Sequence, residues 1–166
     1  MRRQYRSTVS VTVEREVIEP GETTYLQDAW ELKERIRREE GVLKQRRGFF
    51  TDAYRRSTVQ AYVTAEDQLI GFAATRRDGY ILFLAVAPEF RGDGYAKRLV
   101  AAVAEEHSSV TCHARTTNAG ALGFYESVGF ERVRRVNGYY EDGGDAFYLR
   151  LGEGDLKSKL SRFVGL

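Results

Sequence analysis

The amino-acid sequence predicts an α/β fold, with a mixed and largely antiparallel sheet of about seven strands flanked by helices. Short runs of alternating or continuous apolar residues, of the length that a strand needs, recur along the chain. Longer segments between them carry apolar residues at helical spacing. Asp78 and Gly79, which lie between two of the strand-like runs, are a strong signal for an antiparallel hairpin.

The first third of the chain is expected to hold one strand and two helices. Residues 8–13 alternate between valine and small polar residues, as a half-buried strand does. A helix is expected after Thr23 or Thr24, either of which can cap it, and Gly41 is expected to end it. Its apolar face carries Tyr25, Ala29, Leu32 and Ile36. A second helix is expected over residues 42–56.

The rest of the chain alternates expected strands with two more helices. The strand-like runs cover residues 59–63, 69–75, 81–87, 110–115, 130–136 and 146–151. Pro88 ends the third of these runs, because proline has no N–H for a sheet. One helix is expected from Tyr95, and the other follows Asn118 and ends at Gly129.

Composition indicates an ordinary soluble protein. The chain has 166 residues, 42% apolar and 30% charged, and we expect one domain over residues 1–151 with a polar tail over 152–166. A single cysteine excludes an internal disulfide and suggests a reducing compartment. No apolar run approaches the roughly 20 residues of a membrane helix, so we expect a cytoplasmic protein without a membrane segment. The net charge of +2 is too small to argue for nucleic acid.

A glycine turn joins the strand that ends before Pro88 to the helix that begins at Tyr95. Its sequence is Arg91-Gly92-Asp93-Gly94-Tyr95-Ala96. Glycines let the backbone bend tightly and let a ligand approach it, and the N–H groups and dipole at a helix N-terminus suit a phosphate. The pattern predicts an anion site or, in the other interpretation, only a tight turn. It is neither a Walker loop nor a full dinucleotide fingerprint.

Two blocks of sequence resemble the GNAT superfamily of N-acyltransferases. Arg91-x-x-Gly94-x-Ala96 is similar to the acetyl-CoA pyrophosphate loop of that family, and residues 118–130 are similar to the helix after its fifth strand. The resemblance covers residues 59–151 well and residues 1–55 poorly. It implies the GNAT fold, an acetyl-CoA-dependent N-acetyltransferase domain that binds acetyl-CoA where the fourth and fifth strands part, and no metal. The cofactor contacts that it implies are Val86, Arg91, Gly92, Asp93, Gly94, Tyr95, Ala96 and Asn118.

The resemblance also implies roles in acetyl transfer. Tyr125 matches the family tyrosine that faces the CoA sulfur, and its phenol is neutral at pH 7 and can donate a proton; the other interpretation is a core tyrosine on an amphipathic helix. The family stabilises the oxyanion with a backbone N–H that falls near Val86. Asn118 matches the asparagine that holds the pantetheine arm, and it can also cap its own helix.

His113 is the candidate general base. Residues 113–118 resemble the Glu-Val-Arg-x-x-Asn segment of the ribosomal-protein alanine N-acetyltransferases, in which the glutamate is the base and here His113 takes its place. An imidazole with a pKa of about 6.5 is neutral near pH 7. It is a competent base for an α-amine, whose pKa is about 7.7–8.0, whereas a lysine near 10.4 needs more help. The other interpretation is a strand histidine held by a local hydrogen bond.

Tyr139 and Tyr140 are the candidate acceptor residues. Residues 134–146 are similar to a segment of the protein N-terminal acetyltransferases in which two tyrosines close over the peptide N-terminus. The other interpretation is packing of hairpin aromatics across strands. The resemblance therefore implies direct acetyl transfer in a ternary complex to an amine, with a protein N-terminal α-amine favoured and a lysine or small-molecule amine as the alternative.

Arginines gather in residues 35–56, among several glutamates. This pattern favours a solvated helical face over a surface for RNA, so nucleic acid is not expected as a partner. A non-catalytic CoA-binding module or an RNA-associated module is the alternative from another functional class. An exposed sheet edge would allow a homodimer.

Overall fold

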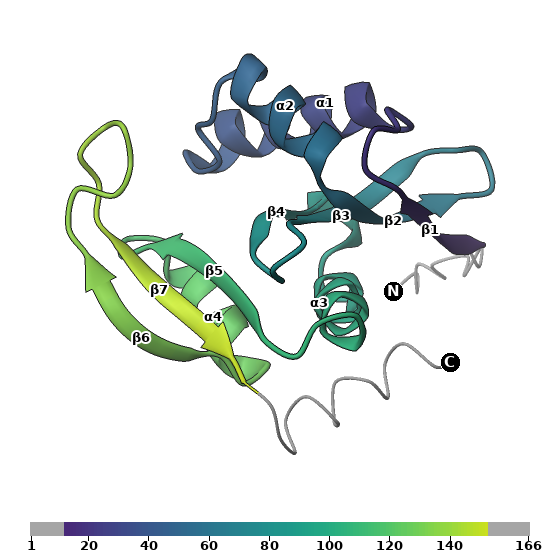
Figure 1. Ribbon diagram of the computed structural model, residues 1–166. Coiled ribbons are helices and arrows are strands. Elements are labelled where there is room, and N and C mark those ends of the chain that lie inside the picture. The colour runs from purple at the N-terminus through teal and green to yellow at the C-terminus, as the bar shows by residue number, and fades with distance from the viewer. Residues whose placement is uncertain (1–11, 153–166) are drawn as a thin grey trace, which may run out of the picture.

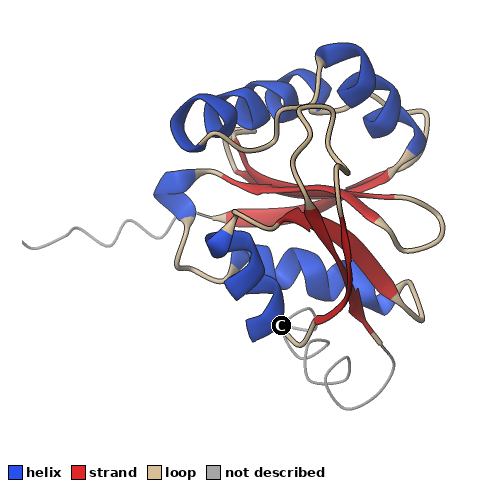
Figure 2. Cartoon of the chain, turned by 90° about the vertical axis from the view of Figure 1, so that its left-hand side faces the viewer, coloured by secondary structure: helices blue, strands red, loops and turns tan. Residues whose placement is uncertain are grey.

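The computed structural model describes residues 12–152, which fold into two antiparallel sheets with helices on both sides (Figure 1). The strand order is β1-β2-β3-β4 in the first sheet and β5-β7-β6 in the second. Figure 2 shows helices above and below the strands, which gives three layers. The predicted fold class, a largely antiparallel arrangement of seven strands flanked by helices, is confirmed.

The first sheet comprises β1 (Val13–Ile18), β2 (Thr58–Thr64), β3 (Leu69–Thr75) and β4 (Ile81–Val86). Both β2 and β3 are buried along almost their whole length. The reason is that α1 (Leu26–Glu40) and α2 (Arg47–Arg56) cover one face of the sheet, and α3 (Tyr95–Glu105) covers the other. β4 is an edge strand of this sheet, so the outer side of its backbone faces the second sheet.

The second sheet and the helix packed on it comprise β5 (Val110–Arg115), β6 (Glu131–Val136), β7 (Ala146–Leu151) and α4 (Ala119–Ser127). The two sheets meet at a bridge between Tyr80 and Thr111 and part beyond it. Gly79 makes this junction, because its φ is 85° and a Cβ here would lie 2.2 Å from the Ser109 carbonyl oxygen. The hairpin predicted at Asp78 and Gly79 is confirmed, since it joins β3 to β4.

The two ends of α1 differ in how well they follow the prediction. Its N-cap is Tyr25, whose φ is 61°, and no side chain caps the helix, so the capping role predicted for Thr23 or Thr24 is wrong. Gly41 ends the helix as predicted. It has a φ of 70°, and its N–H donates to the Arg37 carbonyl at 3.0 Å.

The loop between α1 and α2 replaces the first turn of a predicted helix. Residues 42–46 are not helical, and α2 begins only at Arg47. The loop is held by the buried side chain of Lys33, whose Nζ donates a hydrogen bond to the Gln45 carbonyl. Leu43 has a φ of 56°, which a right-handed helix cannot contain. Tertiary contacts therefore override the apolar periodicity of this segment.

The other predicted elements divide into those that the structure describes and those that it does not. The runs at 69–75, 110–115 and 146–151 coincide with β3, β5 and β7. Residues 8–11 of the first predicted strand lie outside the described residues, as does the tail after residue 152, while the observed β1 covers Val13–Ile18. In the described part of the chain, no helix has the length and apolar character that a membrane crossing requires.

Candidate active site

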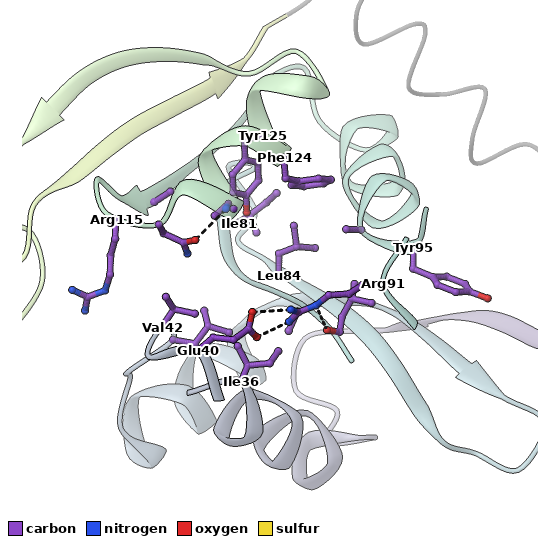
Figure 3. A pocket seen from close by; sticks show the side chains of 18 of the residues that line it. Ile36, Glu40, Val42, Ile81, Leu84, Arg91, Tyr95, Arg115, Phe124 and Tyr125 are labelled. Atoms are coloured by element: carbon purple, nitrogen blue, oxygen red, sulfur yellow. Dashed lines mark hydrogen bonds and ion pairs between the residues drawn. The ribbon is translucent and has the colours of Figure 1, made fainter. Parts of the chain in front are cut away.

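A pocket of about 630 Å³ opens where β4 and β5 part (Figure 3). Its walls come from these two strands, the glycine turn, α4, the end of α1 with the loop that follows it, and the loop between β6 and β7. Leu82 contributes to this opening. Ala74 pairs with Phe83 and the next residue of β3 pairs with Ile81, so Leu82 is the extra residue of a β-bulge. A bulge bends its strand, here beside the pocket.

The backbone of Val86 faces the gap between the two sheets. Ala87 N–H donates to the Ile70 carbonyl at 2.8 Å, so Val86 and Gly71 oppose each other as a pair that is not hydrogen-bonded. The N–H and C=O of Val86 therefore point away from β3, toward β5. The same alternation directs the backbone groups of Leu84 into the gap. The N–H of Val86 is the predicted oxyanion donor.

The glycine turn brings the N-terminus of α3 to one end of the pocket. Gly92 and Gly94 have φ values of 89° and 85°, and nothing lies within 4 Å of the position of a Cβ on either. The turn needs glycine for its conformation and leaves open space over its backbone. Every residue of the predicted cofactor turn except Asp93 lines the pocket. The Tyr95 ring, however, packs on Tyr62, with 5.3 Å between ring centroids, and points away from the pocket interior in Figure 3.

Arg91 ties the glycine turn to α1 and to β4. Its two terminal nitrogens each lie 2.7 Å from a carboxylate oxygen of Glu40, and its Nε donates to the Val86 carbonyl at 3.2 Å (Figure 3). The hydrogen bonds from Arg91 lower the pKa of Glu40, against the opposing effect of burial. Glu40 is absent from the sequence prediction because it stands 51 positions from Arg91, in a segment without family resemblance.

Tyr125 and Asn118 both reach the pocket from α4. Asn118 is the N-cap residue, and its Oδ1 accepts a hydrogen bond from Ala121 N–H at 3.1 Å, so the predicted capping role is met. Tyr125 is buried, with its ring against Phe130. Burial and the neighbouring thiol of Cys112 raise the pKa of Tyr125 well above its usual value. Its phenol is therefore protonated at neutral pH and can donate.

His113 lines the same pocket from β5. Its Nδ1 lies 2.6 Å from the Tyr80 hydroxyl, and its ring stacks on Tyr139 with 4.0 Å between centroids and 8° between planes. Burial, then the charges of Arg134 and Arg76, lower the pKa of His113. The imidazole is therefore neutral at pH 7, as a base must be. Tyr80 has no motif around it, and only the fold shows that it holds His113.

The predicted acceptor residues lie beside His113. Tyr140 lines the pocket, whereas Tyr139 covers His113 and its hydroxyl lies 3.1 Å from that of Tyr80. The guanidinium of Arg115 stands over the Tyr140 ring at 4.0 Å from its centroid. Tyr140 thus lines the pocket, whereas Tyr139 packs on His113 and on Tyr140 without lining it.

The pocket combines three groups suited to acyl transfer. A protonated phenol, a neutral imidazole and an outward-facing backbone N–H all lie along it, and the N-terminus of α3 stands at one end. On the acceptor side the wall is largely apolar, with Ile36, Val42, Leu43 and Leu82. Among residues 12–152, no group of three or more histidine, cysteine or acidic side chains is arranged to hold a metal ion.

The sequence matches a known family model and several characterised relatives. The family model described as "Acetyltransferase (GNAT) domain" matches residues 44–150. N-alpha-acetyltransferase 30 of Saccharomyces cerevisiae is 40% identical over 81 residues, and N-alpha-acetyltransferase MAK3 of Arabidopsis thaliana is 41% identical over 78. These matches cover 46% and 44% of this chain and 46% and 41% of the relatives. The chain therefore spans less than half the length of these two relatives.

Solved structures share the fold at low sequence identity. Ard1 from Thermoplasma volcanium has a TM-score of 0.70 at 22% identity and covers 87% of this chain and 100% of its own. The ribosomal-protein-S18-alanine N-acetyltransferase from Escherichia coli has a TM-score of 0.65 at 21% identity, over 86% and 97%. NAA60 of Arabidopsis thaliana in complex with acetyl-CoA has a TM-score of 0.64 at 22% identity, over 86% and 100%.

Proposed function

Because the chain belongs to the GNAT family of acetyltransferases, we propose that it transfers an acetyl group from acetyl-CoA to an amine. The amine that we propose is the α-amino group at a protein N-terminus. We propose that the activity belongs to a single domain within residues 1–151. The observation that carries the proposal is that neutral His113 and protonated Tyr125 line one pocket, with Tyr140 on the same wall.

The pocket has groups that fit acetyl-CoA. The backbone N–H and C=O of Leu84 face the gap and can pair with the amides of the pantetheine arm, while the N–H of Val86 is kept for the thioester carbonyl. The glycine turn and the N-terminus of α3 offer N–H groups to the diphosphate. The amide of Asn118, whose oxygen caps α4, has N–H groups left for the arm. When bound, acetyl-CoA supplies the thioester from which the acetyl group is taken.

Three groups of the chain then act on the reaction. His113 takes the proton that the amine loses as the new C–N bond forms. In the tautomer whose Nδ1–H donates to the Tyr80 hydroxyl oxygen, Nε2 carries the lone pair and receives that proton. The N–H of Val86 donates to the carbonyl oxygen as negative charge develops on it. Tyr125 gives its proton to the sulfur as the C–S bond breaks. Solvent afterwards takes the proton from His113 and returns one to Tyr125.

Several observations support a protein N-terminus as the acceptor. Tyr139 and Tyr140 lie beside His113, as the resemblance to N-terminal acetyltransferases implies. An α-amine, with a pKa of about 7.7–8.0, is partly neutral at pH 7 and can use a base whose own pKa is low. The yeast and Arabidopsis relatives reported above are themselves named N-alpha-acetyltransferases.

The arginines of α1 bear on the rival RNA-associated function. Arg35 pairs with Glu89 and Glu39, and Arg37 pairs with Glu34, each within 3.3 Å. This pairing favours a solvated, internally neutralised helix face, so we do not propose nucleic acid as a partner. β6 is an exposed edge strand, and the homodimer that such an edge would allow stays a prediction that sedimentation can test.

Thiol release from acetyl-CoA tests the proposed function. Three peptides are compared. The first two share one lysine-free sequence and have a free and a blocked N-terminus. The third has a blocked N-terminus and one internal residue replaced by lysine. We expect turnover with the first peptide alone. Turnover with the lysine peptide alone would show that lysine, and not the N-terminal amine, is the acceptor. Binding of acetyl-CoA without turnover on any amine would leave only a CoA-binding module.

A further inference from the structure

The tip of the loop between β6 and β7 is fastened across the pocket by one carboxylate. Asp142 Oδ1 accepts hydrogen bonds from Arg115 Nη1 at 3.1 Å and from Gly144 N–H at 3.0 Å, and Oδ2 accepts one from Lys44 Nζ at 3.3 Å. These partners belong to β5, to the same loop and to the loop between α1 and α2. Figure 1 shows the loop between β6 and β7 rising from its sheet toward the side on which α1 and α2 lie.

The partners of Asp142 are themselves parts of the pocket wall. Arg115 lines the pocket, only 15% of its side chain is exposed, and its guanidinium covers Tyr140. Lys44 also lines the pocket. The loop that carries Lys44 is also held by the buried Lys33 of α1, through the Gln45 carbonyl. Asp142 and Lys33 therefore hold the same loop from two different elements.

The charge of Asp142 is permanent at working pH. Hydrogen bonds from Arg115 and Gly144 N–H, with a smaller one from Lys44, lower the pKa of Asp142 to about 2. Among the described residues, the charged side chains that pair with Asp142 are Arg115 of β5 and Lys44 of the loop between α1 and α2. The contacts of Asp142 are thus present throughout the range in which an acetyl transfer would be assayed.

Glu141, the neighbour of Asp142, provides a natural control. It pairs with Arg46 across the same two loops, but the nearest atoms are 3.9 Å apart and the two side chains are 87% and 89% exposed. Such a pair contributes almost nothing to stability in water. Only one of the two acidic residues at the tip is therefore placed to fasten the loops.

We propose that Asp142 is a positioning residue for the acceptor: by holding Lys44 and Arg115 together it makes the two loops into a strap across the acceptor side of the pocket. The strap is defined as Lys44, Asp142 and Arg115. It fixes the Tyr140 ring, through Arg115, in the position in which it meets the acceptor. The inference rests on the proposed function for its substrate, and on the contacts of Asp142 for its geometry.

The kinetic test compares Asp142→Asn with Glu141→Gln, since both remove one negative charge from the same turn. We expect Asp142→Asn to raise the KM for the peptide about threefold to fivefold, because its two ion pairs join partly exposed side chains, while the KM for acetyl-CoA stays within about twofold of wild type. Glu141→Gln should leave both unchanged. Lys44→Met should raise the peptide KM less, and adding it to Asp142→Asn should add nothing further, because both break one network.

Hydrogen exchange separates this proposal from the proposed function, because it needs no acceptor. The amide of Gly144 and the amides of residues 42–45 should exchange faster in Asp142→Asn than in Glu141→Gln. If wild type releases no thiol with any peptide, the proposed function fails and exchange alone decides on the strap. Equal exchange in the two variants, or an equal peptide KM, would overturn the proposal, as would a matching rise in the KM for acetyl-CoA.

Discussion

Tyr125→Phe removes one hydroxyl from the centre of the proposed reaction and leaves the ring in place. The side chain is 7% exposed, and its ring centroid lies 5.3 Å from that of Phe124 and 5.0 Å from that of Phe130. Phenylalanine fills the same space, so no cavity forms. The hydroxyl faces the thiol of Cys112, a weak hydrogen-bonding group. We therefore expect the substitution to change the free energy of unfolding by about 1 kcal/mol or less.

The effect of Tyr125→Phe on catalysis should be much larger than its effect on stability. A positioned general acid contributes about 10²–10⁴-fold to a rate. The leaving group here is a thiolate, which is much less basic than an alkoxide and needs less protonation, so the low end applies. We expect kcat to fall about a hundredfold, close to 2.7 kcal/mol in the barrier. The KM for acetyl-CoA should stay within about threefold, because Val86, Asn118 and the glycine turn still hold it.

Thiol release with a chromogenic disulfide measures both constants for wild type and Tyr125→Phe, and thermal unfolding measures stability. Phe124→Leu serves as a matched control, since Phe124 lines the pocket one position away and carries no hydroxyl. A fall in kcat of less than about threefold would refute the assignment of Tyr125 as the acid. A loss of melting temperature as large as that of the control, with a parallel loss of rate, would show that Tyr125 acts only through packing.

Three other predictions follow from the geometry. At saturating substrates, the pH profile of kcat should fall on its acid side with an apparent pKa below about 6.5, because burial lowers the pKa of His113 and only the neutral imidazole is a base. This acid-side fall should be absent in His113→Ala. Arg91→Ala and Glu40→Gln should each raise the KM for acetyl-CoA, by about tenfold for Arg91→Ala. The double variant should have the same KM as Arg91→Ala, because both changes break one ion pair. A lower KM in Glu40→Gln would instead make Arg91 a direct ligand of the diphosphate. Cys112 should resist iodoacetamide at pH 8 until the protein is unfolded, because burial raises the pKa of its thiol to about 12; rapid labelling of native protein, seen by mass, would contradict its burial.

Strands β2 to β7 could be predicted from sequence because their signals are local, whereas β1 lies at Val13–Ile18 and not at the predicted residues 8–13. The strand-like sequence runs at β3, β5 and β7 begin and end at the same residues as the strands. Glycine marks both the hairpin at Gly79 and the end of α1 at Gly41. The loop at residues 42–46 could not be predicted in this way. Its apolar residues continue a helical spacing, but the contact of Lys33 with the Gln45 carbonyl decides its shape, and that contact spans 12 positions.

The candidate site divides in the same manner. Tyr125 and His113 were found through motifs, and both line the pocket. Tyr80 and Glu40 were missed, because their partners His113 and Arg91 stand 33 and 51 positions away and nothing near either residue marks it. Sequence motifs carry the groups proposed for the chemistry here, whereas the groups that hold them in place become visible only when the sheets are assembled.

The most direct test of the central claim is to locate the acetyl group on a single peptide that offers both kinds of amine. A peptide with a free N-terminus and one internal lysine is incubated with acetyl-CoA and the full chain, and fragment masses assign the product. We expect acetyl on the α-amine, with Tyr125→Phe slowing its appearance. Acetyl on the lysine alone, or equal acetylation of both amines, would contradict the claim that this pocket serves protein N-termini.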